Sequence, residues 1–419
     1  MAQGKNDDLI TVLDIGTSKI CAMIARNPAD GDLQVLGTGQ RESKGVSRGF
    51  ISDIKLAETA IRGAVEQAER IAGVGVESAW VGFSAGGLVS KIVNIEADLG
   101  GHRIEQAHID DLLAAGRDAI DPEGLHLLHA HPTLYTLDGL EGVKNPLGLH
   151  ADQLGVDIHA VLAERSPVLN LEYCVGSAYL HVERVVAAPV ATGLACLSAE
   201  ERDLGVALVE LGAGITNVSL FAGGMLVGLT SIPQGAADIT DAIATQFGMR
   251  RAQAERLKCV HGSAMTSPRD NHEMLEVPST PGQEAVDPLR VTRAQLNAVI
   301  RERLEELAAR IAEALDAMGF TGPVGRQVVL TGGGAELKGI ADFAQGVLGR
   351  SVRGGKPVAL AGLPEAHSSP AFAALAGLAR FAASAPLDLK TMVSADQLVH
   401  RVAGGGLWTR FKTAFKSEY

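Results

Sequence analysis

Short hydrophobic runs of strand length alternate with stretches of helical spacing along most of the chain. The runs occupy residues 9–14, 19–24, 80–83, 184–188, 205–210 and 327–331. Residues 55–72 carry apolar positions at helical spacing, from Leu56 through Ile61 and Val65 to Ile71, and predict an amphipathic helix. The alanine-rich stretch 370–383 predicts a second, packed helix.

The most regular helical pattern begins at Thr292, which forms a capping box with Gln295. Apolar residues then recur at intervals of four and three positions. They are Leu296, Ile300, Leu304, Leu307, Ile311 and Leu315. We therefore predict one long helix with a single buried face.

Between about 85 and 164 the pattern changes to short mixed strands, which predicts a separate small domain. Seven of the 12 histidines lie in this stretch, and His129 and His131 would share one face of a strand. No third metal ligand stands at a recognisable spacing, so histidines on the surface or packed in strands are favoured over a metal site. Further on, the polar stretch 262–290 predicts exposed loops.

Length, composition and charge narrow the classes of protein. A chain of 419 residues with 46% hydrophobic residues fits two to three folded domains and excludes a disordered protein. It has no run of eighteen apolar residues, and its polar N-terminus does not resemble a signal peptide. A net charge of −12 argues against nucleic-acid binding. Cys21, Cys174 and Cys196 lie in apolar stretches and are expected to be buried in a reducing, cytoplasmic setting.

Two glycine turns each follow an apolar strand and carry a carboxylate before the glycines. Residues 14–18 read Asp-Ile-Gly-Thr-Ser, and residues 210–216 read Glu-Leu-Gly-Ala-Gly-Ile-Thr. Because glycine lacks a Cβ, the backbone N–H groups of such turns can approach phosphate oxygens closely. The hydroxyls of Thr17, Ser18 and Thr216 can donate to the phosphate as well. The carboxylates would repel phosphate directly, so a hydrated Mg²⁺ between them and the phosphate is expected.

A third turn, residues 331–334 with the sequence Thr-Gly-Gly-Gly, ends its strand without a carboxylate and suits close approach to the sugar and α-phosphate. Any one of these turns alone is more often an ordinary hairpin. Together, with the two acidic turns about 200 residues apart, they resemble the phosphate motifs of the actin-like ATPase superfamily.

Within that superfamily, the chain resembles the FtsA family of bacterial cell division proteins over essentially its whole length. The stretches that carry the resemblance are 13–18, 141–149, 204–214, 232–235, 260–264, 329–334 and the basic, aromatic C-terminal tail. The resemblance implies an α/β, actin-like fold of two lobes around an ATP cleft, with a small inserted α+β domain and a C-terminal amphipathic helix.

By the same resemblance the chain divides into eight segments. The first lobe takes 1–84 and 165–203, with the inserted domain at 85–164 between them. The second lobe has its core at 204–235 and 326–385, with an upper subdomain at 236–325. A flexible linker at 386–406 then leads to a membrane-targeting helix at 407–419.

The resemblance also assigns a nucleotide site for ATP and Mg²⁺. Its residues would be Asp14, Gly16, Thr17, Ser18, Glu210, Gly212, Gly214, Thr216, Glu255, Lys258, Gly332, Gly333 and Gly334. Asp14 and Glu210 would meet the metal through water. Glu255 and Lys258 stand where the superfamily holds the purine, although their spacing also fits an ordinary solvated helix pair.

Departures from the superfamily pattern bear on hydrolysis. Glu210 stands where the superfamily usually has Asp, and Ala213 replaces a glycine. Ala188, followed by Pro189, stands where active hydrolases place a Gln or Glu that orients the attacking water. We therefore expect ATP binding with slow hydrolysis at most.

The C-terminal residues 407–419 read LWTRFKTAFKSEY. On a helix, apolar side chains fall within an arc of roughly 120°, flanked by basic ones. The side chains expected to meet a membrane are Leu407, Trp408, Arg410, Phe411, Lys412, Phe415 and Lys416. This pattern predicts a helix lying in an anionic lipid surface. Docking on the protein body and binding of a partner helix are the alternatives, and the glycines at 404–406 argue against docking.

The function implied by the resemblance is that of an adaptor that ties the FtsZ ring to the cytoplasmic face of the inner membrane at the division septum. The expected partners are the C-terminal tail of FtsZ at 236–325, inner membrane lipids, later division proteins and further copies of the chain in a polymer. A small-molecule kinase would have no use for the amphipathic tail, and a pilus-assembly relative would normally lack it. An Hsp70-like chaperone would need a further domain that the roughly 30 residues after 386 cannot supply.

Overall fold

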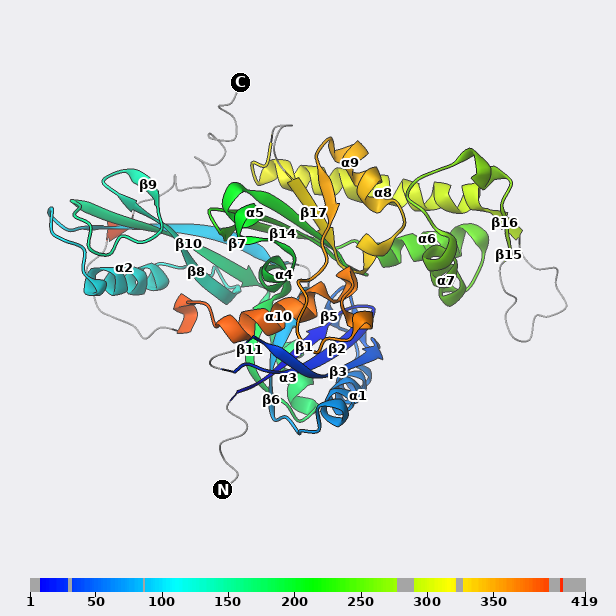
Figure 1. Cartoon of the computed structure of the whole chain (residues 1–419), viewed down its shortest axis with the longest axis horizontal. Helices are drawn as coiled ribbons and strands as arrows, with labels where there is room; N and C mark the ends of the chain where they lie inside the picture. Colours follow the sequence, from blue (N-terminus) through cyan, green and yellow to red (C-terminus); the bar gives the residue numbers. More distant parts are fainter. Residues whose placement is uncertain are drawn as a thin grey trace.

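Two mixed β-sheets form the centre of the molecule (Figure 1). The computed structural model describes residues 8–28, 32–85, 87–276, 290–321, 327–391 and 400–401. The α/β fold of two lobes and the inserted small domain expected from the sequence are both present. In the view of Figure 1, the inserted domain and the helices of the upper subdomain lie at opposite ends of the long axis.

The first lobe is built on a five-stranded sheet. Its strand order is β11 (His181–Ala187), β6 (Ser78–Phe83), β1 (Leu9–Ile15), β2 (Lys19–Arg26) and β3 (Gln34–Glu42). The helices of this lobe are α1 (Ile54–Ala72), α3 (Arg165–Ser177), α4 (Ala188–Cys196) and α10 (Ala373–Ser384). Helix α1 packs on β2 and β3. Helix α10 was expected in the second lobe, as part of 326–385, but it returns to the first lobe and packs on β1, β6 and α4.

Helix α1 shows where its predicted apolar face is right and where it is wrong. Asp53 accepts a hydrogen bond from Leu56 N (3.0 Å) as the N-cap, and Gly73 closes the helix with a φ of 71°. Ile61 and Val65 are buried as predicted. Leu56 and Ile71 are exposed, and the rest of the buried face is made of alanines, from Ala57 to Ala68, which let the helix approach the glycines of β3 closely.

The second lobe shares a ten-stranded sheet with the inserted domain. Its own strands are β18 (Val352–Gly354), β17 (Gln327–Thr331), β12 (Val206–Leu211), β13 (Thr216–Ala222) and β14 (Met225–Ile232). The inserted strands follow as β7 (Val89–Asp98), β10 (Gln153–Ala163), β8 (His126–Leu137) and β9 (Leu140–Val143), and the tenth strand, β19 (His400–Arg401), pairs with β7. The two parts join where Thr230 of β14 pairs with Val89 of β7.

The inserted domain has longer strands than the short ones predicted. Strands β7, β8 and β10 span 10, 12 and 11 residues. Helix α2 (Gln106–Asp118) packs against β7 and β10, and their apolar side chains form a core separate from those of the two lobes. The domain therefore has a hydrophobic core of its own.

The upper subdomain extends from the second-lobe core and is mainly helical. It holds α6 (Ala236–Phe247), α7 (Arg251–His261) and the long α8 (Arg293–Ala317). Thr292 caps α8 through the predicted box with Gln295, and the predicted apolar positions from Leu296 to Leu315 are all buried. The polar stretch was expected to be loop, yet it contributes β15 (Met274–Glu276), which pairs with β16 (Arg290–Thr292).

Short elements complete the described chain. They are β4 (Val46–Ser47), β5 (Phe50–Ile51), α5 (Ala199–Leu204), α9 (Ile340–Leu348), β19 (His400–Arg401), and the 3-10 turns η1 (Pro268–Asn271), η2 (Gly333–Glu336), η3 (Glu365–His367), η4 (Pro370–Phe372) and η5 (Leu389–Thr391). Cys21, Cys174 and Cys196 are buried as predicted, and Cys259 is exposed. Within the described ranges, no helix is both long and apolar enough to cross a bilayer.

The predicted flexible linker, 386–406, is not flexible at its start. Asp388 and Leu389 are buried, and the Asp388 carboxylate accepts a hydrogen bond from Ala130 N of β8 (3.0 Å). The carbonyl of Leu387 meets His131 Nδ1 at 2.8 Å. The chain is therefore held on the inserted domain at residues 387–391, and again at β19, where His400 pairs with Glu96 of β7. The sequence did not indicate this contact because it joins residues more than 250 positions apart.

Candidate functional site

The three glycine turns predicted from the sequence lie together where the two lobes meet. The first turn joins β1 to β2, and Gly16 N donates to Lys19 O at 3.1 Å. The second joins β12 to β13, where Gly212 N donates to Ile215 O at 2.9 Å. The third follows β17, which runs parallel to β12 and places Thr331 opposite Glu210. Strand pairing thus places the second turn beside the third, whereas the first turn belongs to the separate sheet of the first lobe.

The glycines allow the turns to touch. A Cβ added to Gly214 would lie 3.0 Å from Thr17 Oγ1, so the second turn sits directly against the first. A Cβ added to Gly334 would lie 2.9 Å from Leu211 Cβ, so the third turn sits against the second. Gly332 has a φ of 83°, a conformation that other residues rarely adopt. The three turns therefore lie in contact with one another, and backbone N–H groups of such turns suit phosphate.

Two carboxylates, Asp14 and Glu210, accompany these turns. Burial raises the pKa of Asp14 to about 6 and that of Glu210 to about 7, and the charge of Asp14 adds to the upward shift at Glu210. Glu210 Oε2 accepts a hydrogen bond from Asn217 Nδ2 (3.2 Å), and Glu210 Oε1 lies 3.4 Å from Thr192 Oγ1. Two carboxylates whose charges repel fit a hydrated cation between them, so the residues present suit Mg²⁺.

The raised pKa of Glu210 predicts a pH-dependent gain in stability for Glu210→Gln. An acid whose pKa is raised by folding binds more protons in the folded state, so the protein loses stability as pH rises from about 4.5 toward 7. Glutamine removes that loss. In the absence of divalent cations, its free energy of unfolding relative to wild type should rise by about 2–3 kcal/mol between pH 5 and pH 8. Urea denaturation at both pH values measures this, and an equal difference at the two would contradict the assignment.

The hydroxyls expected to donate to phosphate differ in their freedom to do so. Thr17 Oγ1 accepts a hydrogen bond from Gly49 N at 3.0 Å and keeps its own proton for another partner. Ser18 is exposed. Thr216 is fully buried and its hydroxyl donates to Gln234 O at 2.8 Å, so its proton is already used. The expectation that Thr216 supplies a phosphate donor is therefore not supported.

Glu255 and Lys258, the predicted purine pair, lie on α7 beside the third turn. Lys258 Nζ donates to Glu255 Oε2 (2.8 Å), Thr240 Oγ1 (2.7 Å) and Ala236 O (2.9 Å). Ala236 Cβ lies 3.4 Å from the position a Cβ on Gly334 would take. Lys258 is only 7% exposed, which does not fit the alternative of a solvated helix pair. All three donors of its ammonium group are engaged by Glu255, Thr240 and Ala236.

Ala188 begins α4 directly after β11, at the place the sequence suggested. It is buried, and its carbonyl accepts from Thr192 Oγ1 at 2.8 Å, next to Glu210. Its methyl group cannot orient a water molecule.

Lys19 is a candidate site residue that was not singled out from the sequence. It is the first residue of β2, and its Nζ lies 3.3 Å from the centre of the Phe372 ring. Burial lowers its pKa, and the negative charges of Asp14 and Glu336 partly oppose that shift. The available signal was a lysine placed immediately after the first glycine turn.

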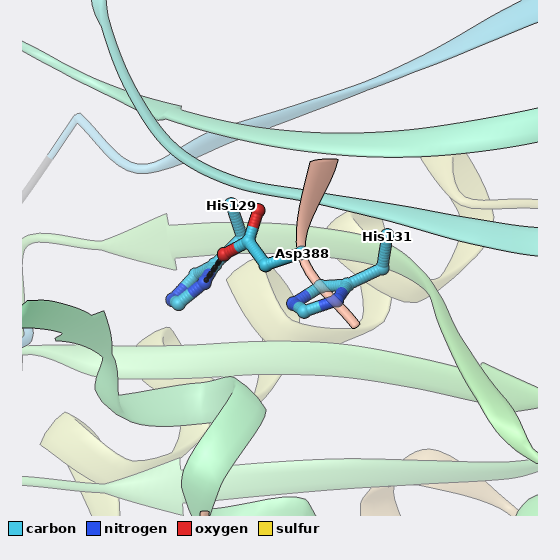
Figure 2. Close-up of side chains that lie close together, drawn as sticks. All are labelled: His129, His131 and Asp388. Atoms are coloured by element: carbon cyan, nitrogen blue, oxygen red, sulfur yellow. Dashed lines mark hydrogen bonds and ion pairs between the residues drawn. The ribbon is translucent and has the colours of Figure 1, made fainter. Parts of the chain in front are cut away.

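Two histidines of the inserted domain, His129 and His131, contact the segment that follows α10 at Leu387 and Asp388 (Figure 2). His129, His131 and Asp388 each offer a ligand atom, and these atoms lie within 4.8 Å of one another. However, both nitrogens of His129 are engaged: Nδ1 faces Asp388 Oδ2 at 3.1 Å, and Nε2 accepts from Ala187 N at 3.0 Å. Burial lowers the pKa of His129 to about 4, which keeps the ring neutral. The geometry supports the predicted packing role over a metal site, and Asp388 is the third residue that sequence spacing did not reveal.

The residues predicted to bind a membrane, Leu407, Trp408, Arg410, Phe411, Lys412, Phe415 and Lys416, lie outside the described residues.

Comparisons with known proteins agree with the fold and the insertion. A family model described as cell division protein FtsA matches residues 207–377, and one described as the SHS2 domain inserted in FtsA matches residues 86–162. The cell division protein FtsA of Agrobacterium fabrum is 38% identical over 395 residues, covering 92% of this chain and 89% of the relative. That of Rhizobium meliloti is 36% identical and covers 99% and 96%. That of Escherichia coli K12 is 27% identical and covers 93% of each.

Solved structures share the fold at low sequence identity. A chain of the PilM–PilN type IV pilus biogenesis complex matches with a TM-score of 0.61 and 17% identity, covering 88% of this chain and 97% of that one. MreB5 of Spiroplasma citri bound to ADP matches with a TM-score of 0.55 and 11% identity, covering 90% and 97%.

Proposed function

Because the chain belongs to the FtsA family of bacterial cell division proteins, we propose that it is an ATP-binding adaptor that ties the FtsZ ring to the cytoplasmic face of the inner membrane. The observation that carries the nucleotide part is the meeting of three glycine turns beside Asp14 and Glu210. Relatives named for cell division support this reading over the kinase and pilus-assembly alternatives.

ATP and Mg²⁺ are the proposed ligands of the site. The backbones of residues 14–18 and 210–214 would bind the phosphates, with Lys19 as a nearby cation. Asp14 and Glu210 would hold the hydration shell of Mg²⁺, which would neutralise charge on the phosphates. Gly332, Gly333 and Gly334 would lie against the ribose and α-phosphate, and Glu255 with Lys258 against the purine.

Membrane attachment is proposed through residues 407–419, on the sequence pattern alone. The contact of Asp388 with β8 and the pairing of β19 with β7 support a course of the C-terminal segment along the inserted domain before it reaches the proposed anchor. The adaptor would then sit at the division septum with its inserted domain near the anchor.

The proposed protein partners follow the segments of the family. The FtsZ C-terminal tail would bind the upper subdomain, 236–325, where α6, α7 and α8 pack together. Later division proteins would bind the inserted domain, whose residues contribute nothing to the three glycine turns. Further copies of the chain would assemble into a polymer.

Hydrolysis of ATP is expected to be slow. Ala188 supplies no group to orient water, and Glu210 places its carboxylate one methylene farther out than Asp would. Steady-state phosphate release from the full-length chain should fall far below turnover on the order of 10 per second. Turnover near that value would contradict the expectation.

A nucleotide-release assay on the full-length protein, run with and without anionic liposomes, tests the proposal as a whole. We expect a bound ATP analogue in both cases and co-sedimentation with the liposomes. A protein that binds liposomes but no nucleotide would overturn the ATP assignment and leave the membrane assignment standing.

A further inference from the structure

A two-residue turn of the first lobe reaches between the phosphate turns. Arg48 and Gly49 form the tip of the hairpin β4/β5, with φ values of 48° and 76°. Gly49 N donates to Thr17 Oγ1 at 3.0 Å, and a Cβ on Gly49 would lie 2.7 Å from Ala85 Cα. A Cβ on Gly214 would lie 3.1 Å from Arg48 Cα. A non-glycine residue at positive φ is uncommon and persists where its surroundings hold it.

The side chain of Arg48 crosses from the first lobe to the second. Its guanidinium donates to Pro233 O and, at 2.8 Å, to Asp238 Oδ1 on α6. The Arg48 side chain is 48% exposed and that of Asp238 24%. At this exposure, the ion pair alone adds little to overall stability. Its position, rather than its strength, distinguishes it from the surface pairs within each lobe.

The N-terminus of α6, to which Arg48 binds, is hydrogen-bonded to the second phosphate turn. Ala236 N donates to Gly212 O at 2.9 Å, and Ala237 N donates to Ala213 O at 2.8 Å. Asp238 itself caps this end, since its Oδ2 accepts from Gly235 N at 2.7 Å. Ala236 O also accepts from Lys258 Nζ. A displacement of Asp238 would therefore move the turn that faces the phosphates and the residue pair proposed for the purine.

We propose that Arg48 is a latch between the lobes, a positioning residue that holds the second phosphate turn closed over a bound nucleotide. The inference rests on the proposed ATP site. With nucleotide bound, the ion pair of Arg48 and Asp238 would hold both lobes in contact with the nucleotide. Breaking the pair would let the second lobe move away and the nucleotide dissociate.

The test is the release rate of a fluorescent ATP analogue from the full-length protein, chased with unlabelled ATP. Arg48→Ala should release the analogue about fivefold faster than wild type. Arg48→Lys keeps the charge and should release it at an intermediate rate. Arg48→Ala combined with Asp238→Asn should release it no faster than Arg48→Ala alone, because the pair is already broken.

The matched control is Arg290→Ala, which removes an exposed arginine paired with Glu276 inside the upper subdomain at 3.0 Å. Its release rate should equal that of wild type. If Arg48→Ala also releases at the wild-type rate, or if the effects of Arg48→Ala and Asp238→Asn multiply, there is no latch. A wild-type protein that fails to bind the analogue would instead overturn the ATP site itself.

Discussion

Replacing Gly334 by glutamate is expected to abolish ATP binding. The position has no room for a side chain, since its Cβ would lie 2.9 Å from Leu211 Cβ and 3.1 Å from Leu211 O. The turn would have to shift away from the second phosphate turn, and a negative charge would enter next to the proposed phosphate site. We expect the dissociation constant of an ATP analogue to rise roughly 100-fold or more, equivalent to about 2.7 kcal/mol.

Gly346→Glu is the matched control for this variant. Gly346 lies on α9 of the same lobe and is exposed. A Cβ added there would meet no atom within 4 Å outside its chain neighbours and the backbone of its own helix. The same substitution there should leave the dissociation constant of the ATP analogue within twofold of wild type. The only change expected is a small one in helix stability, because Glu has a higher helix propensity than Gly. If Gly334→Glu binds the analogue as well as Gly346→Glu, the third turn does not face the nucleotide.

Loss of the C-terminal tail is expected to abolish membrane binding. Burying the side chains of Leu407, Trp408, Phe411 and Phe415 would each contribute up to about 1.5–3 kcal/mol, and less at an interface, where burial is partial. Arg410, Lys412 and Lys416 would add about 1 kcal/mol each near an anionic surface. Because the apolar contribution is the larger, salt should weaken binding without abolishing it.

Sedimentation with anionic liposomes measures this effect. A chain cut before Gly404, and Trp408→Glu in the full chain, should both stay in the supernatant while still binding ATP. Thr413→Glu is the matched control, because at 100° per residue position 413 falls opposite the apolar arc. It adds the same charge and should still pellet. A truncated chain that pellets would place the anchor elsewhere.

Local patterns in the sequence predicted the elements that carry their own signals. The capping box at Thr292 and the apolar stripe of α8 were confirmed to the residue, since a cap and a buried face depend only on nearby positions. The three glycine turns were located because each follows a buried strand. The actin-like fold was implied by the resemblance of these turns to the motifs of the superfamily, and the comparisons confirm it.

Contacts between distant segments were the part that sequence could not supply. Asp388 binds His129 across 259 positions, and Arg48 binds Asp238 across 190. Neither pair has a spacing that marks it. The hydrogen bond from the Thr216 hydroxyl to Gln234 O depends on the pairing of β13 with β14. It therefore could not be predicted from the sequence alone.

Recruitment of purified FtsZ to anionic liposomes tests the adaptor function most directly. With the full-length chain and ATP present, FtsZ should pellet with the liposomes. With the chain cut before Gly404, it should remain in the supernatant. If the full-length chain pellets and FtsZ still stays in the supernatant, the chain does not tie FtsZ to the membrane.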